Sequence, residues 1–145
     1  MFFFNKLLGF RDFSKLEEIK KTISSKFNFD KDENIDKAKE LIIFETSRQK
    51  TWIIATEKKL FCVLDNVEND TFEIRWHMAA DEIIKDNKID LDIKVVDSYK
   101  KNTGLVDFGK NHREWLYSKK YFSSPDKLRE KVAELLTHKM LKSAN

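Results

Sequence analysis

The stretch Phe72–Met78 (FEIRWHM) decides the fold class, because apolar and polar residues alternate along it without a break. A period of two is typical of a β-strand, whose successive side chains point to opposite faces of a sheet. We expect its apolar set to face the core and its polar set, which includes His77, to face water. Residues 89–95 repeat the alternation, so the chain is predicted to contain a β-sheet.

Other short apolar runs predict further strands on both sides of this stretch. They lie at residues 41–44, 51–56, 60–64, 105–108 and 114–118. The sequence therefore predicts about seven strands, joined by short polar connections. Residues 79–87 are expected to hold a turn of helix between two of the strands.

Two amphipathic helices are predicted to flank the strands. Ser14 and Glu17 have the spacing of a capping box at the start of the first helix. Ser124 is the expected N-cap of the last helix, with Pro125 at its first position, where a missing N–H costs nothing. The apolar stripe of the first helix consists of Phe13, Leu16, Ile19 and Ile23 and is continued by Phe27, and that of the last helix consists of Leu128, Val132, Leu135, Leu136 and Met140.

The composition indicates one folded domain that lacks cysteine-based chemistry. The chain has 145 residues, of which 41% are apolar, and this is enough to fill a core despite a charged fraction of 37%. A single cysteine excludes a disulfide framework, a Cys-based zinc site and a CxxC redox pair. We expect an α+β fold in which residues 1–36 form a helical extension and residues 37–145 form the strand-containing domain.

The first ten residues are unusually apolar and require an explanation. Seven of the twelve Phe residues fall within the first 29 positions. No run approaches the length of a membrane-spanning helix, and the terminus makes a poor signal peptide, so a cytoplasmic protein is expected. The apolar side chains can pack on the chain's own core, on another subunit or partner, or on a membrane surface. The candidate anchoring residues are Phe2, Phe3, Phe4, Leu7, Leu8 and Phe10.

The order of the predicted strands and the final helix resembles the pleckstrin-homology-like superfold, including its GRAM-type and bacterial members. The resemblance is carried by Glu40–Phe44, Thr51–Phe61 and Phe122–Leu128, and it covers about residues 37–142. It implies a bent antiparallel sheet or barrel of about seven strands, closed by a C-terminal amphipathic helix. It also implies a scaffold that binds phosphoinositides, proteins or peptides, and that is rarely an enzyme.

The resemblance further implies a candidate site for an anionic lipid headgroup near the first hairpin. Lys39, Arg48 and Lys50 match the basic positions of the lipid-binding members, although Lys50 stands where a second Arg is usual. A Lys offers a point charge and cannot form the bidentate fork of an Arg. Lys58 and Lys59 add two more cations that could contact the same headgroup.

No catalytic, cofactor or metal site is predicted. Cys62 is expected to be a small buried side chain, and nothing in the sequence places it beside His77 or His112. Residues 99–145 carry eleven basic and five acidic groups among several aromatics, but these aromatics are expected to be packing residues, so nucleic acid is disfavoured. We predict a non-catalytic module for protein–protein interaction or self-association. The alternatives are peripheral binding to an anionic membrane and an enzyme of unrecognised type.

Overall fold

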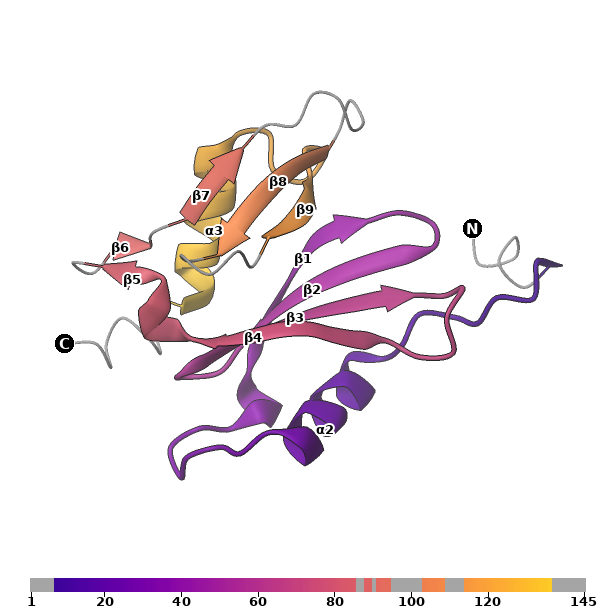
Figure 1. Cartoon of the computed structure of the whole chain (residues 1–145), viewed down its shortest axis with the longest axis horizontal. Coiled ribbons are helices and arrows are strands. Elements are labelled where there is room, and N and C mark those ends of the chain that lie inside the picture. Colours follow the sequence, from indigo (N-terminus) through magenta and orange to yellow (C-terminus); the bar gives the residue numbers. More distant parts are fainter. Residues whose placement is uncertain (1–6, 86–87, 90, 95–102, 109–113, 137–145) are drawn as a thin grey trace.

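The computed structural model describes residues 7–85, 88–89, 91–94, 103–108 and 114–136. These residues have an α+β fold, as predicted, and their strands form three antiparallel sheets (Figure 1). The described strands form separate sheets and do not close into a single barrel. Among the described residues, no helix combines the length and the apolar character needed to cross a membrane.

The largest sheet has four strands and follows the order of the sequence. Its strands are β1 (Lys39–Glu45), β2 (Gln49–Ala55), β3 (Lys59–Asn66) and β4 (Glu73–Ala79). A second sheet pairs β5 (Ile84–Lys85) with β6 (Lys88–Ile89), and a third contains β7 (Leu91–Lys94), β8 (Thr103–Phe108) and β9 (Glu114–Ser118). The helices are α2 (Leu16–Lys26) and α3 (Pro125–Leu136), with short 3₁₀ turns η1 (Ile35–Lys37) and η2 (Ala80–Glu82).

Both faces of the four-stranded sheet are covered. Helix α2 lies on one side, and α3 lies with the β7–β9 sheet on the other (Figure 1). On the α2 side, Ile19 and Ile23 share a core with Phe61 of β3. On the α3 side, Leu128 and Val132 share a core with the other face of the same strands. The helical extension is therefore packed into the fold, and the predicted boundary between residues 36 and 37 falls inside η1.

A β-bulge in β4 changes which apolar residues meet which core. Cys62 pairs with Trp76 while its neighbour Val63 pairs with Ile74, so Arg75 is an extra residue in β4. Trp76 consequently packs on the α3 side, whereas Ile74 packs on the α2 side. The expectation that one apolar set faces one core was therefore wrong, because the bulge interrupts the period of two on which it relied.

His77 is exposed to solvent, as predicted, and its ring also contacts aromatic residues on the α2 side of the sheet. Its ring centroid lies 4.6 Å from that of Phe27, in an edge-to-face arrangement, and 6.2 Å from that of Phe61. Phe27 directly follows α2, which covers this side of the sheet, so the His77 ring packs on Phe27 while its side chain remains exposed.

The two predicted helix caps have opposite outcomes. The backbone N–H of Lys127 donates to Ser124 Oγ over 3.3 Å, so the cap of α3 is confirmed. Helix α2 instead begins after Lys15, which makes no side-chain capping bond, so the predicted Ser14 capping box was wrong. Ser14 is diverted to a tertiary contact, since its backbone N–H donates to Asp65 Oδ2 over 2.6 Å.

Candidate interaction surface at the N-terminal segment

The N-terminal segment, residues 7–15, leads into α2 and exposes large apolar side chains to solvent. It runs past the end of the four-stranded sheet where the β1–β2 and β3–β4 loops lie (Figure 1). Leu7 is 67% exposed and Leu8 is 50% exposed, and in the described part of the chain only Tyr121 joins them as an exposed large hydrophobic. Of the other candidate anchoring residues, Phe10 is half-buried, and Phe2, Phe3 and Phe4 lie outside the described residues.

A group of polar contacts, which we call the Asp65 cluster, fixes this segment to the sheet. The Asp65 carboxylate, fully buried at the end of β3, accepts from Arg11 Nη2 and from the backbone N–H of Ser14. The Arg11 guanidinium also donates to the carbonyl of Asn66 over 3.0 Å and to that of Asn69 over 2.7 Å. One side chain of the segment thus bridges the end of β3 and the β3–β4 loop, with charge-assisted hydrogen bonds.

Two aromatic residues of the segment contact the β1–β2 hairpin. Arg48 Cζ lies 5.0 Å from the ring centroid of Phe10, and Lys50 Nζ lies 4.6 Å from that of Phe13. Both distances suit a cation–π contact. From Phe10 onward, the segment is therefore attached to two neighbouring loops of the sheet, while the leucines before it remain exposed.

The cations predicted to bind a lipid headgroup lie at two different ends of the sheet. Arg48 and Lys50 lie at the β1–β2 hairpin. Lys39 pairs in register with Ala55 and thus lies at the opposite end, as do Lys58 and Lys59. The length of β2, about 20 Å for a seven-residue strand, separates the two groups.

Four of these five cations form ion pairs within the chain. The closest N···O distances are 3.0 Å for Arg48 with Glu68, 3.6 Å for Lys50 with Glu45, 2.7 Å for Lys58 with Asp30 and 2.6 Å for Lys59 with Glu33. The hairpin contains the predicted basic residues, but each has an anionic neighbour, so the described surface does not present an uncompensated basic pocket there.

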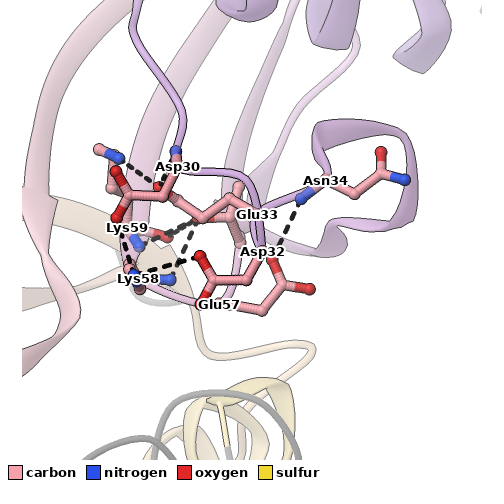
Figure 2. A network of polar contacts seen from close by, with 8 residues as sticks. Asp30, Asp32, Glu33, Asn34, Glu57, Lys58 and Lys59 are labelled. Carbon is pink, nitrogen blue, oxygen red and sulfur yellow. Dashed lines mark hydrogen bonds and ion pairs between the residues drawn. The ribbon is translucent and has the colours of Figure 1, made fainter.

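A second group of polar contacts, the Glu33 cluster, lies at the β2–β3 turn (Figure 2). The Glu33 side chain is fully buried and accepts from Lys59 Nζ and, over 2.6 Å, from the Thr56 hydroxyl. Its Oε1 atom also accepts from the backbone N–H of Asp30 over 3.1 Å. These bonds fasten the loop between α2 and η1 to the turn.

The exposed edge of the Glu33 cluster contains a weaker set of charges around Lys58 (Figure 2). The Lys58 ammonium donates to Asp30 and lowers the pKa of that carboxyl, and Asp30 and then Asp32 raise the pKa of Lys58. All three side chains are open to solvent, where such pairs contribute little to stability. We therefore interpret the surroundings of Lys58 and Lys59 as structural.

Cys62 and His77 do not form the Cys–His pair that nucleophilic catalysis would require. Cys62 is completely buried in the core on the α3 side, and burial raises the pKa of its thiol. His77 lies with Phe27 on the α2 side, and His112 is outside the described residues. Within the described ranges, no group of three or more His, Cys, Asp or Glu side chains is arranged to hold a metal ion.

Sequence reasoning found the exposed leucines but missed the residues that hold them in place. Arg11 and Asp65 are 54 positions apart, so no local spacing indicates that they meet. The one available signal was an Asp that directly follows the apolar run of β3, where a buried carboxylate needs a partner.

No protein-family model, curated protein or solved structure matches the chain.

Proposed function

We propose that this chain is a non-catalytic binding module that self-associates through its N-terminal segment. The observation that carries the proposal is the exposure of Leu7 and Leu8 immediately before the Asp65 cluster fixes the chain to the sheet. Burying one leucine side chain stabilises by about 1.5–3 kcal/mol. Covering these two residues on each of two copies would therefore supply a substantial part of the free energy of association.

The charges beside the leucines favour a second copy of the chain over an anionic membrane. Arg11 is paired with Asp65, and the hairpin cations Arg48 and Lys50 are paired with glutamates. A surface with balanced charges does not repel an identical surface, as a two-fold interface requires. An anionic membrane, in contrast, attracts segments with an excess of Lys and Arg.

The order of the sheets supports a pleckstrin-homology-like scaffold for this module. Four consecutive strands form one antiparallel sheet, three later strands form another, and α3 follows them against the core. This order of elements is the one on which the resemblance of the sequence rests. In such a scaffold, the extension that carries the leucines is an addition to the sheet-and-helix domain.

The test is a measurement of molar mass by light scattering on the wild type and on the double variant Leu7→Ser/Leu8→Ser. We expect a dimer or larger species for the wild type and a monomer for the double variant. The matched control is Tyr121→Ser, because Tyr121 is as exposed as Leu8 but lies outside the N-terminal segment. The control is expected to associate like the wild type.

Three results would contradict the proposal. The first is a wild type that is monomeric at every concentration. The second is a double variant that associates as strongly as the wild type. The third is a monomeric wild type that sediments with anionic vesicles and not with neutral ones, which would establish the membrane alternative instead.

A further inference from the structure

We infer that Arg11 is a positioning residue for self-association, which holds Leu7 and Leu8 in a fixed place beside the β1–β2 hairpin. The inference rests on the proposed function and adds how the contact surface is organised. It predicts that loss of the Arg11 contacts weakens association beyond any effect on folding.

The position of Arg11 in the segment supports this role. Its guanidinium reaches Asp65, the carbonyls of Asn66 and Asn69, and the carbonyl of Asp12 over 3.0 Å. The Asp65 side chain, to which it binds, is itself completely buried and cannot shift without breaking the packing of β3. Arg11 thus links an exposed segment to a rigid part of the molecule.

The two residues between Leu8 and Arg11 transmit this constraint to the leucines. Gly9 has a φ of +77°, a left-handed conformation that turns the chain sharply and that other residues rarely adopt. Phe10 comes next and lies against Arg48 of the hairpin. Leu8 is therefore only two and three residues from Phe10 and Arg11, which both contact the sheet. These contacts limit the positions that Leu8 can take.

A segment that is already ordered loses less conformational entropy when it binds than a free one does. Without the Arg11 contacts, the leucines would still be present and exposed, but the segment would have to be ordered during association. We therefore expect a weaker complex from a variant that has the same apolar residues. This separates the role of Arg11 from that of the leucines themselves.

The chain offers a matched control for the loss of a buried ion pair. Lys59 binds the fully buried Glu33 at the start of β3, as Arg11 binds the fully buried Asp65 near its end. The two clusters are about 20 Å apart along the strand. Lys59→Met removes the cation that pairs with Glu33 and leaves the N-terminal segment unchanged. Arg11→Met removes the cation that pairs with Asp65, within the segment itself.

The experiment measures the dissociation constant of the self-associated species by sedimentation equilibrium for the full-length wild type, Arg11→Met, Arg11→Lys and Lys59→Met. Circular dichroism establishes a temperature at which all four proteins are folded. We expect Arg11→Met to raise the dissociation constant about tenfold or more and Lys59→Met to leave it within about twofold. Arg11→Lys should fall between them, since it keeps the charge but loses the planar fork.

The outcomes distinguish this inference from the proposed function. A wild type that never associates contradicts the proposed function. A wild type that associates, with Arg11→Met unchanged and Leu7→Ser/Leu8→Ser impaired, contradicts the positioning role alone. An equal rise of the dissociation constant in Arg11→Met and Lys59→Met also contradicts the positioning role, because the loss of association would then be explained by lower folding stability. If Arg11→Met does not fold, the dissociation constants of Arg11→Lys and Lys59→Met are compared instead. A higher value for Arg11→Lys supports the positioning role, and equal values contradict it.

Discussion

Asp65 and Glu33 are the two acidic residues that the described part of the chain buries, and they determine where the N-terminal extension lies. Each is satisfied by one cation and by at least one further donor. A buried carboxylate without such partners is strongly destabilising, so loss of either cation is expected to be costly. They fix the chain on both sides of α2, one before the helix and one after it.

At the same scale, the burial of Cys62 leads to a prediction about its reactivity. The thiol is expected to stay unmodified by a thiol-reactive disulfide reagent at neutral pH, and to react fully when denaturant is added. The reason is that burial raises the pKa of Cys62 and also blocks access to its sulfur. Absorbance at the wavelength of the released thiolate follows the reaction.

The same group gives a pH dependence with a definite sign. Because the pKa of Cys62 is higher in the folded chain than in the unfolded chain, its contribution to stability is complete below the unfolded value of about 8.5. It decreases as the pH rises above that value. Rapid modification of the native protein, or a stability that does not change between neutral and alkaline pH, would contradict this description of the thiol.

At the scale of the elements, the two helices begin in different ways. Helix α3 has a side-chain cap from Ser124, whereas α2 begins at an uncapped Lys15 and depends on its apolar face. Ile19 and Ile23 are completely buried, so packing on the sheet holds α2 where capping does not.

This difference predicts unequal effects for two similar substitutions. Ser124→Ala is expected to lower the free energy of unfolding by about 1 kcal/mol, the usual value for loss of an N-cap. Ser14→Ala is expected to lower it by less, because the Ser14 hydroxyl caps no helix and accepts only a long 3.3 Å bond from Arg11, whereas the bond to Asp65 comes from the backbone N–H. Urea denaturation followed by circular dichroism measures both, and a larger loss for Ser14→Ala would count against the assignment.

The sequence predicted the positions of the strands better than their faces. Alternation located β4, and short apolar runs located β1, β2 and β3, because burial imposes a period on the residues that form a strand. The bulge at Arg75 leaves no mark in the composition, so the division of Ile74 and Trp76 between two cores could not be predicted. Similarly, Ser14 satisfied a local capping pattern, but a tertiary partner took its backbone N–H.

At the scale of the whole molecule, α2 makes the four-stranded sheet a covered layer with a core on each side. Phe61, together with Ile54 and Val63, would face water on the outer side if α2 were absent. The extension is thus required by the sheet that it covers, and the exposed leucines precede the part that is required.

Two truncations are expected to separate these parts. Removal of residues 1–30 takes away α2 and should expose the apolar face of the sheet, with aggregation and strong binding of a hydrophobic dye. Removal of residues 1–9 keeps Arg11 and α2 and should leave the fold intact, while it abolishes self-association. Circular dichroism and dye fluorescence measure the state of the fold in both truncations, and sedimentation velocity measures self-association after removal of residues 1–9. A stable, dye-free protein after removal of residues 1–30 would contradict the role given to α2.

The candidate site could be predicted only in part, for reasons of the same kind. Leu7 and Leu8 stand in an apolar stretch with few cations, which indicated an anchoring role, and the structure leaves both exposed. The basic hairpin residues indicated a headgroup site, but Lys50 pairs with Glu45 across the same hairpin and Arg48 pairs with Glu68 of the β3–β4 loop. The Arg48–Glu68 pair joins two loops 20 positions apart, and the Glu45–Lys50 pair depends on the exact register of the hairpin, so neither was predicted from the sequence.

Sedimentation velocity of the wild-type chain over a wide range of concentration tests the central claim most directly. Self-association through the exposed leucines predicts a sedimentation coefficient that rises with concentration from the monomer value to that of a dimer or larger species. A coefficient that stays at the monomer value throughout would contradict the account.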